Sequence, residues 1–243
     1  MTPKDPFAPD RRALLGGALA IFAATASPAF ADDEAKPEED AAAEAETSAA
    51  SDVSLADKGY AVGDIVLGDP EAPVEIIEYA SLTCPHCASF HTGAFPAIKA
   101  DYIDAGKARL VLREVYFDQF GLWAAMIARC GGDKGYYNLV GMFLERQREW
   151  YQDHVRAFNE TKNPEPLIDD MMKIGRLAGL SNERMNACLS DQGLLERLVT
   201  DFQTTTTADG VRSTPTFFVN GEEVKGAVSA KAMAEVIDKY LGG

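Results

Sequence analysis

Two cysteines separated by two residues, Cys84-Pro85-His86-Cys87, lie where a short β-rich run (74–79) gives way to a helical pattern. At such a junction the first cysteine falls at the helix N-terminus, where unpaired N–H groups and the positive end of the helix dipole favour an anion. We therefore expect Cys84 to be an exposed, acidic thiol. Cys87 lies one turn behind it, so we expect it to be buried and close enough to form a disulfide with Cys84. Because a low thiol pKa improves the leaving group, this disulfide would be an oxidant.

The two residues between the cysteines suit this chemistry. Pro85 fits the first helical position, because its missing N–H would have been unpaired there. His86 adds a hydrogen-bond donor and, when protonated, a positive charge beside the Cys84 sulfur. An ordinary solvated histidine at an exposed helix start is the alternative interpretation of His86.

A zinc site is the alternative interpretation of the two cysteines. Such a site would need a second pair of ligands at suitable spacing. The other candidate ligands are scattered along the chain: His91, Cys130, His154 and Cys188. The sequence therefore favours thiol redox chemistry, and we expect no metal.

The ordered part of the chain has the pattern of one α/β domain. A second strand is predicted at 109–115, and the chain becomes helical from about 121 to 208. Asn220-Gly221 supplies the two positive-φ residues of a type I′ turn, which predicts a hairpin between the flanking β-rich runs. An amphipathic helix is expected at 230–241.

The N-terminus has the pattern of an export signal, predicted to span residues 1–31. Arg11 and Arg12 precede an uncharged run of fourteen residues (13–26), and Ala29 and Ala31 form an A-x-A cleavage site. The run is shorter than the roughly 20 residues of a spanning helix, although an uncleaved anchor is the alternative. The arginine pair resembles a twin-arginine signal, and general secretion fits as well. We expect the mature chain to work outside the cytoplasm, without an integral membrane segment.

Residues 32–56 have the composition of a disordered acidic linker. They carry nine acidic residues, one lysine and eight alanines, so they hold −8 of the formal charge of −15. Such a segment cannot bury enough apolar surface to offset its ordering entropy. The acidic balance also argues against nucleic acid as a partner, because phosphate binding needs clustered Lys and Arg. We expect the folded domain to span 57–243.

Further motifs lie on either side of the helical stretch. Ser213-Thr214-Pro215-Thr216 precedes Phe-Phe-Val-Asn-Gly, and Glu78 lies six residues before Cys84. Together with the tetrad, these residues resemble the thioredoxin-fold thiol:disulfide oxidoreductases, and within them the DsbA-like periplasmic oxidases. The resemblance covers roughly residues 60–241. It implies a thioredoxin fold with a helical insertion, about 118–209, between the second active-site strand and a cis-proline loop at Thr214-Pro215.

The same resemblance implies roles for individual residues. Glu78 matches the buried carboxylate beneath the active site, with a solvated strand carboxylate as the alternative. Pro215 matches the cis-proline, with a trans turn proline as the alternative. Cys130 and Cys188 have helical flanks, and an even leftover pair in an oxidising compartment suggests a disulfide. Some DsbA-like proteins carry such a second, non-catalytic disulfide, and two buried reduced thiols are the alternative.

The function implied is that of a periplasmic dithiol oxidase without a cofactor. It would introduce disulfides into reduced or unfolded exported proteins through a Cys84–Cys87 redox pair. A membrane partner of the DsbB type would reoxidise it. Thr214 before the proline also occurs in disulfide isomerases, so a reductase or isomerase is an alternative. A copper-handling or binding module without turnover is another.

Overall fold

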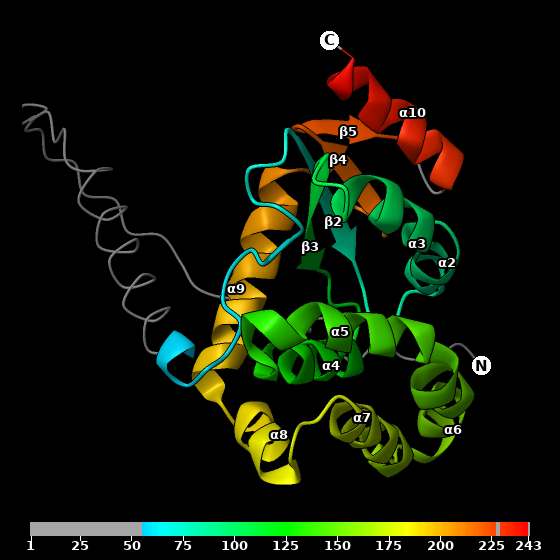
Figure 1. Ribbon diagram of the computed structural model, residues 1–243. Helices are drawn as coiled ribbons and strands as arrows, with labels where there is room; N and C mark the ends of the chain where they lie inside the picture. Colours follow the sequence, from blue (N-terminus) through cyan, green and yellow to red (C-terminus); the bar gives the residue numbers. More distant parts are fainter. Residues whose placement is uncertain (1–54, 227–228, 243) are drawn as a thin grey trace, which may run out of the picture.

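The computed structural model describes residues 55–226 and 229–242. Its strands form one five-stranded sheet in the order β1-β3-β2-β4-β5 (Figure 1). Only the β2–β3 pairing is parallel among these strands. The strands are β1 (Val66–Leu67), β2 (Val74–Ala80), β3 (Ala108–Glu114), β4 (Thr216–Val219) and β5 (Glu222–Val224). This is the thioredoxin-like sheet that the sequence predicts.

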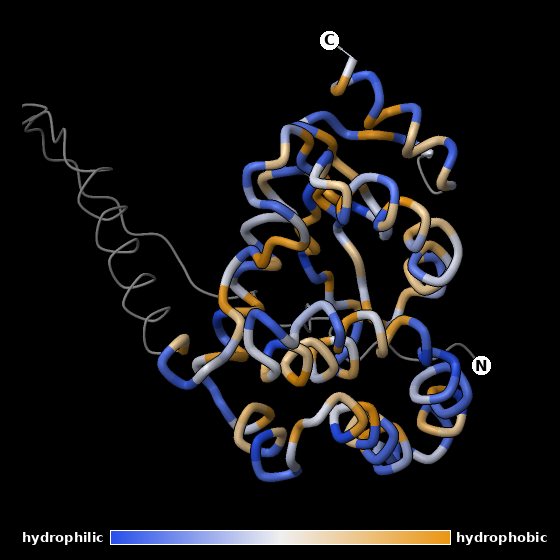
Figure 2. The backbone as a smooth tube through the Cα atoms, viewed as in Figure 1, coloured by the Kyte–Doolittle hydropathy of each residue, from blue (hydrophilic) through white to orange (hydrophobic). Residues whose placement is uncertain are grey.

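Helices account for most of the remaining described chain. Those outside the helical insertion are α2 (Pro85–Gly93), α3 (Phe95–Ile98), the π-helix η1 (Lys99–Ile103) and α10 (Ala230–Leu241). Those between β3 and β4 are α4 (Gln119–Cys130), α5 (Gly132–Glu145), the π-helix η2 (Arg148–Gln152), α6 (Asp153–Thr161), α7 (Glu165–Leu177), α8 (Asn182–Leu189) and α9 (Gln192–Ala208). Hydrophobic and hydrophilic residues alternate along the helices of this insertion (Figure 2), as expected for helices with one buried face.

The register of the central strand brings distant segments together. β2 pairs with β3 from Val74↔Ala108 to Ala80↔Glu114, and with β4 from Ile76↔Val219 to Tyr79↔Thr216. The end of β2 therefore lies beside the start of β4. The loop that carries Cys84 follows β2, and Pro215 immediately precedes β4. The strand pairing thus places these two loops next to each other at the same end of the sheet.

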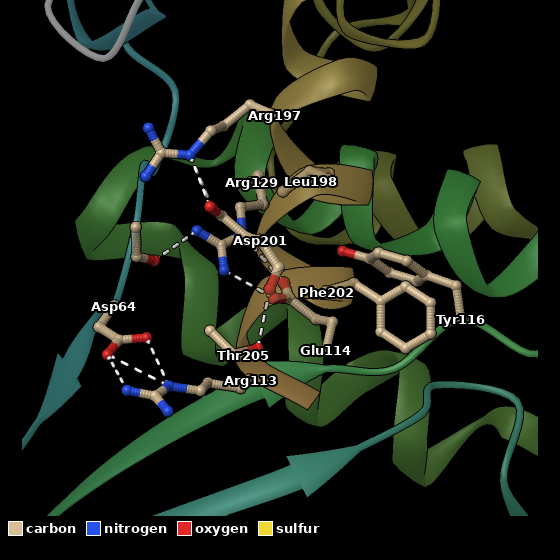
Figure 3. Close-up of a pocket in the computed structure, with 11 residues that line it drawn as sticks. Asp64, Arg113, Glu114, Tyr116, Arg129, Arg197, Leu198, Asp201, Phe202 and Thr205 are labelled. Atoms are coloured by element: carbon tan, nitrogen blue, oxygen red, sulfur yellow. Dashed lines mark hydrogen bonds and ion pairs between the residues drawn. The ribbon is translucent and has the colours of Figure 1, made fainter. Parts of the chain in front are cut away.

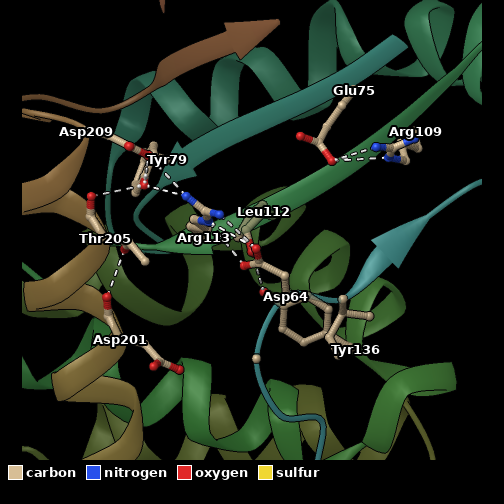
Figure 4. A network of polar contacts seen from close by, with 12 residues as sticks. Asp64, Glu75, Tyr79, Arg109, Leu112, Arg113, Tyr136, Asp201, Thr205 and Asp209 are labelled. Atoms are coloured by element: carbon tan, nitrogen blue, oxygen red, sulfur yellow. Dashed lines mark hydrogen bonds and ion pairs between the residues drawn. The ribbon is translucent and has the colours of Figure 1, made fainter. Parts of the chain in front are cut away.

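Each face of the sheet is covered. α2, α3 and α10 pack on one face, where Phe90, Ile98 and Met233 join the buried side chains of the strands. On the other face, α9 lies along β2 and β3 (Figure 1). There the Tyr79 hydroxyl donates to Asp209 Oδ2 (2.5 Å) and accepts from Arg113 Nη1 (2.8 Å), which links β2 and β3 to the end of α9 (Figure 4).

Ion pairs line a cavity of about 240 Å³ between β3, residues 63–64, α4 and α9 (Figure 3). Its arginines contact acidic side chains. These pairs are Arg129–Glu114 (2.6 Å), Arg113–Asp64 (2.8 Å) and Arg197–Asp201 (2.8 Å). The lining includes neither cysteine of the tetrad. Two of these pairs connect separate segments: Arg129 of α4 contacts Glu114 of β3, and Arg113 of β3 contacts Asp64 of the N-terminal segment, whereas Arg197–Asp201 lies within α9.

Local sequence signals are confirmed at several turns. Asn220 and Gly221 both have positive φ, 48° and 84°, as the type I′ hairpin requires. The predicted final helix, 230–241, coincides with α10. The predicted helical stretch coincides with α4 to α9 and is interrupted at Gly132 and Gly179, where φ is 64° and 94°.

The predicted linker boundary was wrong at its C-terminal end. The export signal (1–31) and residues 32–54 of the linker lie outside the described residues. Residues 55–57, in contrast, form a helical turn, and Leu55 is 2% exposed. Leu55 joins the cluster that contains Met126, Leu194 and Leu198. This apolar side chain packs between α4 and α9, so Leu55 belongs to the folded part.

Candidate active site

Cys84 is the N-cap residue of α2, with extended backbone angles (φ −82°, ψ 120°), and Pro85 follows in the first turn. This is the position that the junction of strand and helix predicts. The expectation that Cys84 is exposed was wrong in degree, because the residue is 7% exposed. Cys87 is 0% exposed. The Cys84 sulfur is therefore the more accessible of two largely covered sulfurs.

The surroundings of the two thiols separate their pKa values strongly. The pKa of Cys84 is lowered to about 5, and the main cause is a hydrogen bond from the Cys87 thiol. Burial of Cys84 acts in the opposite direction. Hydrogen bonds from the Thr214 side chain and from the backbone N–H groups of Cys87 and His86 also lower this pKa. The same Cys84–Cys87 hydrogen bond, burial and the charge of Glu78 raise the pKa of Cys87. At neutral pH the pair therefore holds one thiolate, on Cys84, and one proton, on Cys87.

His86 lowers the pKa of Cys84 in a different way from the one predicted. Its side chain is exposed, and its contribution to the low pKa of Cys84 comes from the backbone N–H. The backbone N–H groups of the helix N-terminus thus supply part of the thiolate stabilisation that was expected from the imidazole.

The loop before β4 faces the Cys84 sulfur. The Thr214–Pro215 peptide bond is cis. The carbonyl oxygen of Thr214 lies 3.5 Å from Cys84 Sγ and accepts its hydrogen when Cys84 is protonated. The Thr214 hydroxyl oxygen is buried and has no hydrogen-bond partner among the described residues. It is therefore available to donate to a Cys84 thiolate.

Glu78 lies on β2 beneath the cysteines and is 0% exposed. Its Oε2 atom is 2.8 Å from His91 Nε2, while its Oε1 atom is buried without a partner among the described residues. The alternative of a solvated strand carboxylate is therefore wrong. His91 was not predicted to belong to this site. The sequence feature that could have indicated His91 was its position one helical turn after Cys87.

We expect His91→Phe to destabilise the protein, because it would leave a buried carboxylate with no partner at either oxygen. Leaving a buried charged group without its partner in this way costs about 3 kcal/mol or more in the free energy of unfolding. Denaturant unfolding at pH 7 measures the loss, with the exposed pair variant Lys99→Ala as the control. An unchanged free energy of unfolding in His91→Phe would contradict this interpretation of the pair.

The second cysteine pair forms a bridge inside the helical insertion. Cys130, at the end of α4, and Cys188, in α8, form a disulfide with a Cα–Cα distance of 6.0 Å. Both residues are buried and lie in the cluster that contains Leu55. Within residues 55–226 and 229–242 we find no group of three or more His, Cys, Asp or Glu side chains that could hold a metal ion. No helix in that part of the chain is long and apolar enough to cross a membrane.

A thioredoxin-like sheet with a Cys-x-x-Cys helix start opposite a cis-proline defines the class of thioredoxin-fold proteins. A family model described as thioredoxin matches residues 60–239. The structure of alpha-DsbA1 from Wolbachia pipientis is 32% identical, with a TM-score of 0.66, and the match covers 74% of this chain and 92% of that one. The chain belongs to the DsbA-like family of thiol:disulfide oxidoreductases.

Other relatives are consistent with this family. A Rickettsia bellii protein, provisionally named a protein-disulfide oxidoreductase, is 36% identical over 73% of this chain. The match spans 64% of that relative's own length. Oxidised BdbD from Bacillus subtilis shares the fold, with a TM-score of 0.63 at 20% identity over 76% of this chain and 99% of that one.

Proposed function

We propose that this protein is a periplasmic dithiol oxidase that introduces disulfides into exported proteins through the Cys84–Cys87 pair. The observation that carries the proposal is the separation of the two thiol pKa values. A stable Cys84 thiolate favours the reduced pair, and an oxidoreductase whose reduced form is stabilised is a strong oxidant. The export signal predicted at residues 1–31 supports the location.

The proposed reaction begins with attack of a substrate thiolate on Cys84 Sγ of the oxidised pair. The Cys84–Cys87 bond breaks, a mixed disulfide forms at Cys84, and the Cys87 sulfur leaves with the electron pair. Because the pKa of Cys87 is raised, this sulfur takes up a proton. A second substrate thiolate then attacks the substrate sulfur of the mixed disulfide, and Cys84 leaves as a thiolate. Two electrons have passed from the substrate dithiol to the enzyme.

The other site residues would assist these steps. The Thr214 hydroxyl would stabilise the leaving Cys84 thiolate, and the backbone beside Pro215 would pair with an extended substrate segment. Glu78 would influence the protonation of Cys87 through its charge. A membrane oxidase of the DsbB type would accept the two electrons and restore the disulfide, so no bound cofactor is needed.

Oxidation of a reduced, unfolded protein tests the proposal. The oxidised form, mixed in equal amounts with reduced ribonuclease A, should form substrate disulfides while Cys84 and Cys87 become reduced. The oxidised protein could instead fail to react with reduced ribonuclease A, while the reduced protein reduces or rearranges the disulfides of scrambled ribonuclease A. This result would support the reductase or isomerase alternative. No thiol exchange in either direction would favour a binding module.

The low pKa of Cys84 predicts how the oxidising power depends on pH. Between about pH 5 and pH 8, reduction by two glutathione thiols releases one proton, because Cys84 ends as a thiolate while glutathione starts as a thiol. The equilibrium constant for reduction of the enzyme should therefore rise about tenfold per pH unit in this window. Below pH 5 the dependence should disappear. A constant that does not change between pH 5 and pH 8 would contradict the thiolate assignment.

Pro215→Ala should trap intermediates. Alanine adds a backbone N–H beside the sulfurs and removes the bulk of the ring, so mixed disulfides with substrate should be resolved more slowly. We expect thiol-sensitive bands of higher mass on a non-reducing gel, with the distant Pro164→Ala variant as the control. If Pro215→Ala turned over like the wild type without trapped species, the role of this loop would be wrong.

A further inference from the structure

A buried glutamine from the helical insertion contacts the backbone of the active-site turn. Gln147 lies between α5 and η2 and is 1% exposed. Its Nε2 atom donates to the carbonyl oxygens of Leu82 (2.8 Å) and Cys84 (2.9 Å). One side-chain amide therefore holds two carbonyl groups on either side of Thr83, in the turn that leads from β2 into α2.

The orientation of this amide is fixed from its other side. Gln152 Nε2 donates to Gln147 Oε1 at 2.6 Å. Because backbone carbonyls only accept hydrogen bonds, the two contacts at Leu82 and Cys84 also require the nitrogen of Gln147 to face the turn. Both amide hydrogens of Gln147 are then used in the turn, and its oxygen has a donor.

The π-helix η2 explains how Gln152 reaches Gln147. Gln147 is the N-cap residue of η2, and Gln152 is its last residue. In an α-helix, residues five apart point in different directions, whereas the i→i+5 bonding of a π-helix brings them together. The buried Trp150 ring, whose Nε1 donates to the Phe143 carbonyl (2.8 Å), holds this turn in place. The local irregularity in the helical insertion thus supports the contact with the active site.

The contact bears directly on the reacting sulfur. α2 has no side-chain cap, and the Cys84 carbonyl accepts from both the Ala88 N–H (3.1 Å) and Gln147. This carbonyl belongs to the same residue as the thiolate, so its partial negative charge opposes ionisation of the sulfur. A second N–H donor on the carbonyl offsets that charge, and it also fixes the peptide plane from which the Cys84 side chain projects.

We propose that Gln147 is a positioning residue that, with Gln152, keeps the Cys84 turn in the geometry that stabilises the thiolate. The inference rests on the proposed function of the Cys84–Cys87 pair. In this interpretation the helical insertion tunes the chemistry of the thioredoxin-like domain, because the stabilising amide comes from outside that domain.

The test compares Gln147→Leu, Gln147→Glu and Gln152→Leu with the control Gln192→Leu, an exposed glutamine of α9. The readouts are the thiolate absorbance of Cys84 against pH and the glutathione equilibrium at pH 7. Gln147→Leu removes both bonds to the turn, and loss of the one to the Cys84 carbonyl should raise the pKa of Cys84 by about half a unit and make reduction by glutathione about threefold less favourable. Gln147→Glu should have a larger effect, because a carboxylate loses both donated bonds and also places a negative charge beside the two carbonyl oxygens. Gln152→Leu should have a smaller effect in the same direction.

The possible results distinguish a failure of the Gln147 proposal from a failure of the proposed function of the Cys84–Cys87 pair. If Gln147→Leu is folded and less stable, but keeps the wild-type pKa and glutathione equilibrium, Gln147 is only structural and the inference is wrong. If Gln147→Leu does not fold, Gln152→Leu decides, because it removes only the bond that orients the Gln147 amide. A folded Gln152→Leu with the wild-type pKa and glutathione equilibrium would then overturn the inference. If the wild type itself titrates near the value of a free thiol, the proposed function fails whatever the variants do.

Discussion

Replacing Cys84 with serine is expected to abolish disulfide transfer, with a loss of more than about 10³-fold in the rate of substrate oxidation. Of the two sulfurs in the tetrad, Cys84 is the one with residual exposure and the one with the low pKa, about 5. A serine hydroxyl can neither form the disulfide nor leave as a stabilised anion at neutral pH. Stopped-flow mixing with a reduced model peptide measures the rate.

Cys87→Ser is the matched variant, and its expected behaviour is different. Cys84 would still form mixed disulfides, supplied from oxidised glutathione or a substrate disulfide. These would be long-lived, because the neighbouring thiol that competes for Cys84 is gone. Mass spectrometry should find the adduct on Cys84. An adduct on Cys87 in the Cys84→Ser variant, formed as fast as the one on Cys84, would reverse the assignment of the two thiols.

Removal of the Cys130–Cys188 disulfide is expected to reduce stability strongly and activity little. The bond closes a loop of 58 residues, for which the chain-entropy model gives about 4 kcal/mol. It connects the end of α4 to α8 within a buried cluster, so both tethering and packing are lost in the double alanine variant. A decrease of about 10 °C in the thermal midpoint should follow.

The control for this variant is turnover at low temperature. Neither Cys130 nor Cys188 lies at a strand-to-helix junction, and both are covered, so oxidation of substrate at 10 °C should remain close to the wild-type rate. Peptide mapping without reductant checks the bond itself. Recovery of both cysteines as free thiols from correctly oxidised protein would contradict the assignment, and a crosslink from either one to Cys84 would indicate a disulfide relay.

Local chemistry explains which features of the fold could be predicted from sequence. The Cys84-to-Cys87 tetrad at a strand end fixes an N-cap position, and Asn220-Gly221 fixes a hairpin, because each depends on a few adjacent residues. The cis-proline loop was predictable only through family resemblance, since isomer choice depends on the surrounding tertiary structure.

Contacts between distant elements were not predictable in the same way. Glu78 and His91 meet only because α2 packs on β2, and Gln147 reaches a turn more than 60 residues earlier in the chain. The low exposure of Cys84 also depends on tertiary packing, because the loop before β4 lies against it. Periodicity does not reveal a π-helix such as η2, whose residues look like those of any amphipathic helix.

The resting redox state of Cys84 and Cys87 in the producing cells tests the oxidase role most directly. Acid quenching protonates the thiolates and stops exchange, and alkylation followed by peptide mapping then distinguishes this pair from Cys130–Cys188. For a dithiol oxidase that is reoxidised at the membrane, we expect Cys84 and Cys87 to be recovered as a disulfide. Their recovery as alkylated thiols, with Cys130–Cys188 still bridged, would contradict that role and indicate a reductase or isomerase.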